Sequence, residues 1–221
     1  MINIAILVFN SFQENTYVVS DGTGECIIVD PGNVSPRENE AISQFIKKNS
    51  LKPVMVVNTH GHIDHILGVQ YLKDTYAIPF ALDGRDAFLV ESAPVHGRMY
   101  GFEMESAPKI DIDLNGRDTV EFGDTKLQII RTPGHTPGHI SLYSPEEKFV
   151  LTGDTLFKGS IGRTDLPGGD YKQIMESIIG KLIPLGGEVN VYPGHGPSTS
   201  IAAELDGNPF ITEVIEGEVN F

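Results

Sequence analysis

The stretch Thr59–Val69 reads THGHIDHILGV and places three histidines and one aspartate at positions 60 to 65. The whole chain has 7 histidines, so such a dense group is a poor match for an ordinary solvated loop. Histidine and aspartate at this spacing are typical metal ligands. The group directly follows the apolar run VMVVN at positions 54 to 58. This run predicts a buried strand whose C-terminal end carries the ligands.

Three other places repeat this pattern of an apolar run followed by a turn with histidine or aspartate. They are TPGHTPGH at 132–139, LTGDTLF at 151–157 and VYPGHG at 191–196. Glycine and proline in each turn let the backbone approach closely and direct a side chain inward. All four ligand sources therefore lie at strand ends, and we expect one rim of the sheets to collect them.

The order of predicted elements indicates an α/β protein. NTYVVS and ECIIVD flank DGTG and predict a hairpin. Ser35 and Pro36 predict a helix start, with the helix continuing through AISQFIKKN. Strands and helices then recur in the second half without a low-complexity linker, which indicates two sheets packed face to face with helices outside. We expect one domain over residues 1–221.

Composition narrows the classes of function. The net charge is −14, from 16 Lys and Arg against 30 Asp and Glu, and no basic run is present, so we expect no nucleic-acid partner. The start MINIAILVFNSF has no basic leader, and no stretch is long enough to span a bilayer. We expect a cytoplasmic protein without a membrane partner; the sequence leaves the oligomeric state open. The single cysteine, Cys26, predicts a buried apolar role, and the acidic segment 204–221 predicts a solvated edge.

The segment Asp83–Arg117 fits the alternation of strands and helices least well. It has a helical start, GRDAFLVES, and then a loop rich in Pro, Gly and Asp. Such an insertion is typical of a functional or mobile segment. The alternative is a peripheral loop whose Met99, Tyr100 and Phe102 cover the core. We expect His96 not to be a ligand, because nothing around it repeats the pattern of the metal site.

Together, H-x-H-x-D-H in THGHIDH, the later histidine in PGHTPGH, the aspartate in TGDTLF and the histidine in YPGHG resemble the metallo-β-lactamase-fold hydrolases. The resemblance covers nearly the whole chain and implies a four-layer αββα sandwich. It also implies two divalent metal ions, zinc in the first place and otherwise iron or manganese. The implied ligands are His60, His62 and His135 for the first ion, Asp64, His65 and His195 for the second, and Asp154 as the bridge.

The string GDTLFKGSIGRTDLPGGD at 153–170 resembles the shorter, single-domain members of the glyoxalase-II-like branch. The β-lactamases of the family usually have a cysteine in the second site, and the flavodiiron proteins have H-x-E-x-D where this chain has His62. The resemblance therefore implies a hydrolase of acyl thioesters, with S-lactoylglutathione or a related glutathione conjugate as the small-molecule substrate. Glyoxalase II proper continues into a helical domain that completes the glutathione site, and here only a short segment follows His195.

The implied reaction is attack by a metal-bridging hydroxide on the thioester carbonyl. Asp64 and Asp154 supply two negative charges against four positive ones, so positive charge remains to activate the water. A thiolate leaves without full protonation, and we find no separate acid in the motifs, which favours thioesters over amides. His139 is expected to form hydrogen bonds behind the ligands.

Two cations are candidates for binding the substrate. Arg163 is placed where the resemblance implies a basic residue that holds the glycine carboxylate of glutathione, and Lys158 is a second candidate. A salt bridge from Arg163 to Asp165 would use the same guanidinium.

Two other reactions are compatible with the same scaffold. One is that of an iron-dependent persulfide dioxygenase, which has similar motifs including GRTD and uses one iron at the first site. The other is lactone hydrolysis, because the same hydroxide can attack an ester carbonyl. A non-enzymatic binding module is disfavoured by the complete ligand set.

Overall fold

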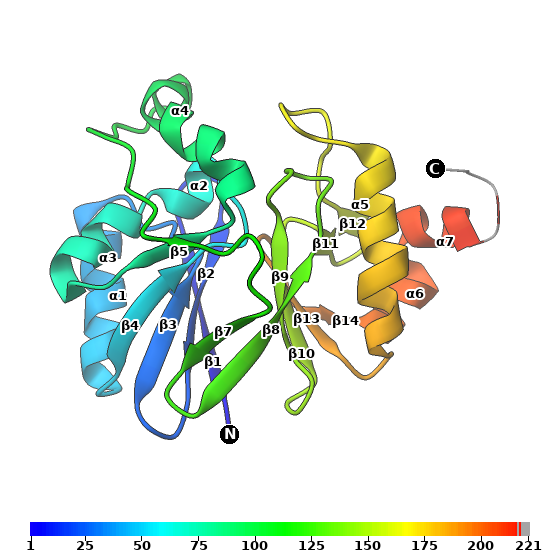
Figure 1. The fold of residues 1–221 in the computed structure, drawn as a ribbon, viewed down its shortest axis with the longest axis horizontal. Coiled ribbons are helices and arrows are strands. Elements are labelled where there is room, and N and C mark those ends of the chain that lie inside the picture. Colours follow the sequence, from blue (N-terminus) through cyan, green and yellow to red (C-terminus); the bar gives the residue numbers. More distant parts are fainter. Residues whose placement is uncertain (216, 218–221) are drawn as a thin grey trace. The chain divides into compact units, whose positions relative to one another are not determined.

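The structure is a computed structural model that describes residues 1–215 and 217. The chain forms two compact units (Figure 1). The first unit contains residues 1–117 and 121–126, and the second contains residues 118–120 and the described residues from 127 onward. Each unit has its own sheet and its own helices, and the two are described in turn.

The first unit contains a six-stranded sheet with the strand order β1-β2-β3-β4-β5-β6. Strands β1, β2 and β3 are antiparallel, and β3 to β6 are parallel. The predicted hairpin is confirmed as β2 and β3, and the run before the histidine group is confirmed as β4. The strands are β1 (Asn3–Phe9), β2 (Glu14–Ser20), β3 (Glu25–Val29), β4 (Lys52–Val57), β5 (Phe80–Leu82) and β6 (Ile112–Asp113).

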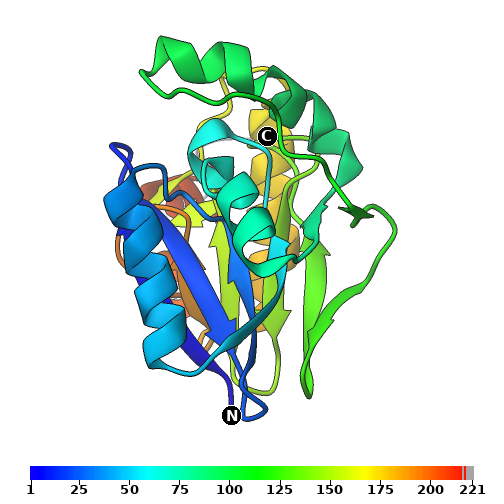
Figure 2. The same cartoon turned by 90° about the vertical axis from the view of Figure 1, so that its left-hand side faces the viewer.

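Helices α1 (Pro36–Lys48) and α3 (Val69–Tyr76) cover one face of this sheet (Figures 1 and 2). The predicted start of α1 is confirmed: Ser35 accepts the backbone N–H of Glu38, and the Glu38 side chain accepts that of Ser35. Such a capping box satisfies two amides that no intrahelical carbonyl reaches. Ile42 and Leu72 are fully buried in the core that these helices form with the sheet.

Two short helices follow His62 in the first unit. A single turn, α2 (Ile63–Ile66), is followed by α3 with Gly68 between them. The buried side chain of Asn33 lies against Gly68 and occupies the space that a Cβ atom there would need. This close approach explains why the chain has glycine at the break.

The insertion is more ordered than the sequence predicts. A short 3₁₀ turn at Gly84–Asp86 leads into α4 (Ala87–Met99), which continues past Pro94 and packs on α2. Phe102 is buried, as expected of a residue that covers the core. Met99 and Tyr100 are 79% and 53% exposed, so the expectation that they also cover the core is wrong.

The second sheet has the order β14-β13-β10-β9-β8-β7, with β10 parallel to β13 and antiparallel to β9. A separate two-stranded hairpin, β11 and β12, lies in the second unit. The strands are β7 (Thr119–Phe122), β8 (Thr125–Arg131), β9 (Ile140–Ser144), β10 (Phe149–Gly153), β11 (Leu156–Phe157), β12 (Ser160–Ile161), β13 (Asn190–Pro193) and β14 (Thr199–Ser200).

Helix α5 (Tyr171–Ser177) packs on the second sheet and continues as a π-helical turn (Ile178–Leu182) and a 3₁₀ turn (Ile183–Leu185). These three segments follow one another directly, and the hydrogen-bonding pattern changes from one to the next. Ile174 and Ile178 are fully buried against Val150 and Val191 of the sheet.

The C-terminal segment is not a solvated edge where the structure describes it. It forms α6 (Ile201–Gly207) and α7 (Pro209–Ile215), and α7 is a helix that the sequence analysis misses. Glu204, Asn208 and Ile211 are buried. Residues 216 and 218–221, which belong to the same prediction, lie outside the described residues.

Cys26 is fully buried in β3, as predicted, and burial raises the pKa of its thiol to about 12. Within residues 1–215 and 217, no helix combines the length and the apolar character needed to cross a bilayer.

Candidate metal site

The predicted ligands follow strand ends, as the sequence indicates. Strand β4 ends just before the histidine group, and β8, β10 and β13 end just before His135, Asp154 and His195. The first unit therefore carries His60, His62, Asp64 and His65, and the second carries His135, Asp154 and His195.

In the first unit, the three imidazoles form one cluster. The ring centroid of His60 lies 4.9 Å from that of His62 and 4.2 Å from that of His65. His62 is the residue before the single turn α2, and Asp64 and His65 lie within that turn. The His65 Nε2 and Asp64 Oδ2 atoms are 3.7 Å apart.

The Nδ1 atoms of His60 and His65 face side chains from behind the cluster. His60 Nδ1 lies 3.0 Å from the Thr59 hydroxyl, and His65 Nδ1 lies 3.2 Å from Asp30 Oδ2. Asp30 also accepts the backbone N–H of Thr59 at 2.7 Å and its hydroxyl at 2.6 Å. A carboxylate behind a histidine orients the ring and raises its basicity toward a metal. In both rings Nε2 is then the nitrogen that could bind a metal.

Asp30 groups with His60 and His65 closely enough to be a metal ligand itself. Because it lies on the Nδ1 side of His65, whereas Asp64 lies near Nε2, we assign it to orienting the ring. Asp30 is not among the residues predicted from the sequence. The sequence does carry a signal for Asp30, because this residue ends the apolar run ECIIVD just as Asp154 follows strand β10.

Three further side chains fix the backbone of the ligand loop, and sequence reasoning missed all of them. Asn58 donates from Nδ2 to the carbonyls of His65 at 2.7 Å and of His60 at 3.5 Å. Asn10 donates to the carbonyl of Asp64 at 3.0 Å. Asp86, just before α4, accepts the N–H of Gly61 at 3.0 Å.

Glu14 is a fully buried carboxyl behind His65. Its Oε1 lies 4.0 Å from His65 Nδ1, and its Oε2 accepts the hydroxyl of Thr16 at 2.8 Å. Burial raises the pKa of Glu14 well above its usual value, although the neighbouring His65 acts to lower it.

In the second unit, Asp154 lies between two imidazoles. Its Oδ2 is 3.6 Å from His135 Nε2 and 3.6 Å from His195 Nε2. Two ligand atoms that share one ion at zinc-like bond lengths lie about 3.3 to 3.8 Å apart. These separations are too long for hydrogen bonds and fit donors around a shared ion.

The tautomer of His135 follows from its partner. Its Nδ1 lies 2.7 Å from the backbone carbonyl of Arg163, which can only accept, so Nδ1 carries the proton. Nε2 then has a free lone pair in the neutral ring, as metal binding requires. The residue before Arg163 is Gly162, and a Cβ atom at Gly162 would collide with the backbone carbonyl of Asp154.

His139 is fully buried and uses both ring nitrogens within the second unit. Its Nε2 accepts the backbone N–H of Asp154 at 3.0 Å. Its Nδ1 lies 3.0 Å from the Thr132 hydroxyl and 3.1 Å from the Thr155 hydroxyl. The expectation that His139 acts behind the ligands is confirmed by these contacts.

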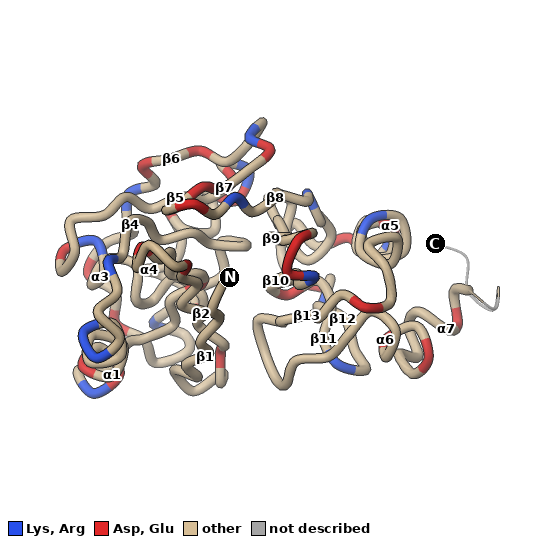
Figure 3. The backbone as a smooth tube through the Cα atoms, turned by 90° about the horizontal axis from the view of Figure 1, so that it is seen from below, with Lys and Arg blue, Asp and Glu red and all other residues tan. Residues whose placement is uncertain are grey.

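The two predicted substrate cations differ in their surroundings. Arg163 forms a bidentate ion pair with Asp165: its Nε lies 2.7 Å from one carboxylate oxygen and its Nη2 lies 2.8 Å from the other. This guanidinium lowers the pKa of Asp165 to about 2. Lys158 is exposed at the turn between β11 and β12. Figure 3 marks the positions of Lys, Arg, Asp and Glu along the backbone of both units.

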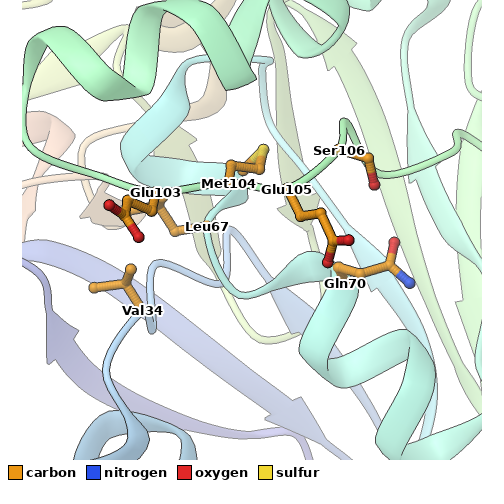
Figure 4. A pocket seen from close by; sticks show the side chains of 7 residues that line it. All are labelled: Val34, Leu67, Gln70, Glu103, Met104, Glu105 and Ser106. Atoms are coloured by element: carbon orange, nitrogen blue, oxygen red, sulfur yellow. The ribbon is translucent and has the colours of Figure 1, made fainter.

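A pocket of about 200 Å³ is present in the first unit (Figure 4). Val34, Leu67 and Met104 give it an apolar part, and Gln70, Ser106 and two glutamates give it a polar part. Its lining, Val34, Leu67, Gln70 and Glu103 to Ser106, includes none of the predicted ligands.

Comparison with known proteins identifies the family. The family model for the metallo-beta-lactamase superfamily matches residues 10–195, which include all seven predicted ligands. The chain belongs to the metallo-beta-lactamase superfamily. Hydroxyacylglutathione hydrolase GloC of Haemophilus influenzae is 36% identical over 216 residues, covering 95% of this chain and 98% of the relative. Probable metallo-hydrolase YqgX of Bacillus subtilis is 36% identical over 202 residues, covering 90% of this chain and 92% of the relative.

Several solved structures have a similar fold. The B3 metallo-beta-lactamase BLEG-1 has a TM-score of 0.88 at 35% identity, covering 95% of this chain and 100% of that one. TTHA1623, in a di-iron-bound form, has a TM-score of 0.83 at 34% identity, covering 93% and 99%. ETHE1 from Myxococcus xanthus has a TM-score of 0.76 at 25% identity, covering 99% and 92%. The predicted α/β metallo-β-lactamase fold is confirmed.

Proposed function

We propose that this metallo-β-lactamase-fold protein is a metal-dependent hydrolase of acyl thioesters. The observation that carries the proposal is the arrangement of the donor atoms. Asp154 Oδ2 lies at equal distances from two imidazole nitrogens, and His60, His65 and His135 keep their Nδ1 atoms against partners within the protein. Such an arrangement of donor atoms is typical of metal ligands rather than of side chains that hydrogen-bond only to one another.

The proposal assigns the two sets of ligands to two ions. His60, His62 and His135 would hold the first ion, Asp64, His65 and His195 would hold the second, and Asp154 would serve both. One family model spans both units, which supports treating residues 1–221 as one catalytic domain. Zinc is the first choice of metal. Iron and manganese remain candidates because mixed histidine and carboxylate sites accept all three.

Two divalent ions in this site would supply an activated water and a Lewis acid for the thioester carbonyl. The protein's own part is to limit the negative charge of the site. Asp64 and Asp154 are the two carboxylates of the proposed ligand set. Glu14 adds a buried carboxyl behind His65, and burial raises its pKa well above the usual value. A thiolate leaves without an acid to protonate it, so the ligand set is sufficient for thioester cleavage.

The name of the Haemophilus influenzae relative supports a glutathione thioester as substrate. Arg163 and Lys158 are the proposed contacts for an anionic thiol portion. The ion pair with Asp165 leaves Arg163 fewer N–H groups for the substrate, because its Nε and one terminal nitrogen already bind Asp165. We therefore expect S-lactoylglutathione to be hydrolysed with a high KM and with modest preference over other thioesters.

An iron-dependent persulfide dioxygenase is the second candidate. The sequence GRTD at positions 162–165 matches that reading. A dioxygenase would use one iron, whereas the thioesterase proposal uses seven ligands for two ions. Lactone hydrolysis is a third candidate, on chemical grounds alone.

A substrate panel tests these candidates. We would compare kcat/KM for S-lactoylglutathione, a neutral acyl thioester, a lactone and a β-lactam, and measure oxygen uptake with glutathione persulfide. The β-lactam belongs in the panel because BLEG-1 is a B3 metallo-beta-lactamase. Thioester cleavage without oxygen uptake is the expected result. Oxygen uptake without thioester cleavage would replace the proposal with the dioxygenase, and cleavage of the lactone or β-lactam alone would replace it with that hydrolase.

A further inference from the structure

Glu204 in α6 and Asn208 just after it are buried polar residues outside the ligand set. They are 2% and 0% exposed. The Glu204 carboxylate accepts the Thr199 hydroxyl at 2.6 Å, the Asn208 amide at 2.8 Å and the backbone N–H of Gly159 at 2.8 Å. Buried polar side chains require such partners, so this group has a fixed position.

Both residues hold the turn between β11 and β12. Glu204 accepts the N–H of Gly159, and Asn208 donates from Nδ2 to the carbonyl of Ser160 at 3.0 Å. Gly159 has φ of +69°, a conformation that side chains other than glycine rarely adopt. The turn is therefore fixed through one donor and one acceptor of its own backbone.

The same hairpin borders the three ligands of the second unit. It begins directly after Asp154 and Thr155, and the Phe157 ring lies 6.2 Å from the His195 ring in an edge-on contact. It ends two residues before Arg163, whose carbonyl accepts from His135. The turn that carries Lys158 therefore lies beside the ligands of the second unit.

We infer that Glu204 and Asn208 are positioning residues that fix Lys158 as the contact for the anionic thiol portion of the substrate. This inference rests on the proposed thioester hydrolase. Lys158 immediately precedes Gly159 and is exposed, and it has no ion pair among the described residues. Arg163, the other candidate cation, is held by Asp165. A lysine on a fixed turn loses less freedom on binding a carboxylate than one on a mobile turn.

The test compares Glu204→Leu with Glu204→Gln. Glutamine can accept from Gly159 and Asn208 through its oxygen and donate to Thr199 through its nitrogen, whereas leucine fills similar space and can do neither. We expect Glu204→Leu to raise the KM for S-lactoylglutathione by about tenfold, as removal of a charge-assisted contact should. Its KM for a neutral acyl thioester and its kcat for both should stay within about twofold, and Glu204→Gln should resemble the unchanged protein.

Lys158→Ala is the second single variant of a double-mutant cycle with Glu204→Leu. Alone, it should raise the same KM by the same factor, and combined with Glu204→Leu it should add nothing, because both changes remove one contact. A second readout does not depend on activity. Hydrogen exchange at the Gly159 amide should be faster in Glu204→Leu than in the unchanged protein.

Leu182→Ala controls for general loss of stability. Leu182 is fully buried in the same core as Ile201, and its loss should lower the melting temperature without changing the ratio of the two KM values. The inference is overturned if Glu204→Leu raises both KM values equally, if it only lowers kcat, or if Lys158→Ala has no effect. If the unchanged protein cleaves neither thioester, the proposed function itself fails. Faster exchange at Gly159 would then support only the structural part of the inference.

Discussion

The imidazole of His139 accepts the backbone N–H of Asp154 at Nε2, with the two nitrogen atoms 3.0 Å apart. Its Nδ1 lies between the hydroxyls of Thr132 and Thr155. His139 therefore holds the backbone of the proposed bridging ligand and has no nitrogen left for a metal. In His135, four residues earlier, Nδ1 contacts the Arg163 carbonyl and Nε2 lies 3.6 Å from Asp154 Oδ2.

Replacement of His139 should weaken metal binding without abolishing it. His139→Ala removes the acceptor for Asp154, and we expect a loss of about tenfold to hundredfold in metal affinity. Asp154→Asn should cost more, because it removes a negative charge from both proposed ions. Competition with a chromophoric chelator measures both affinities. The ligand assignment is wrong if His139→Ala strips the metal and Asp154→Asn retains it.

The ion pair between Arg163 and Asp165 should limit substrate binding. Asp165→Asn weakens the pair and makes the guanidinium available, so the KM for S-lactoylglutathione should fall by about threefold to tenfold. Arg163→Ala should raise this KM and leave that of a neutral thioester nearly unchanged. With Arg163→Ala in place, Asp165→Asn should have no further effect. An Asp165→Asn variant with an unchanged KM would assign Arg163 to structure alone.

Gly162 should tolerate no side chain. A Cβ atom there would collide with the carbonyl of Asp154 and lie 3.2 Å from His135 Nδ1. Gly162→Ala should therefore displace both ligands and lower metal content to one ion per chain or fewer. Gly180→Ala is the matched control, because no atom lies within 4 Å of a Cβ atom at that position. Equal metal content in the two variants would contradict this account of the second unit.

Asp21 should stabilise the first unit only when it is ionised. It accepts hydrogen bonds from Thr23 and from the N–H of Asp124 and the hydroxyl of Thr125. Partial burial acts to raise the pKa of Asp21, but these hydrogen bonds outweigh it and the pKa is lowered. Its contribution is therefore present above the unfolded-state pKa of about 3.9 and is lost as the pH falls through the lower folded-state pKa.

Asp21→Asn should then cost about 1 to 2 kcal/mol of unfolding free energy at pH 7, and this difference should shrink below pH 4. Urea unfolding of the metal-free protein at pH 7, 5 and 3 measures it, with Glu213→Gln on the exposed face of α7 as the control. A difference that stays constant from pH 7 to pH 3 would show that Asp21 acts without its charge.

The main elements of the fold could be predicted because local signals agree with the structure. Ser35 and Pro36 mark the start of α1, and the apolar run before His60 marks β4. The break at Gly68 could not be predicted, because it depends on Asn33, which is distant in sequence and comes into contact only in the folded unit. The burial of Glu204 and Asn208 was missed for the same reason, since their partners lie in a hairpin some 45 residues away.

The candidate site likewise contains residues that could be predicted from the sequence and residues that could not. Ligands at strand ends carry a sequence signal in their spacing and their glycines. The side chains that orient them carry almost none, because Asn10, Asn58 and Asp86 act on the backbone of the ligand loop from separate elements. Asp30 is the exception, since it ends an apolar run in the same manner as the ligands.

The central claim is that seven side chains hold two metal ions that serve thioester cleavage. Elemental analysis of the purified protein after dialysis against a weak chelator, paired with turnover of S-lactoylglutathione on the same sample, tests it most directly. The account predicts close to two transition-metal ions per chain and turnover that rises and falls with the second ion. One ion or none per chain with full thioesterase activity would contradict it.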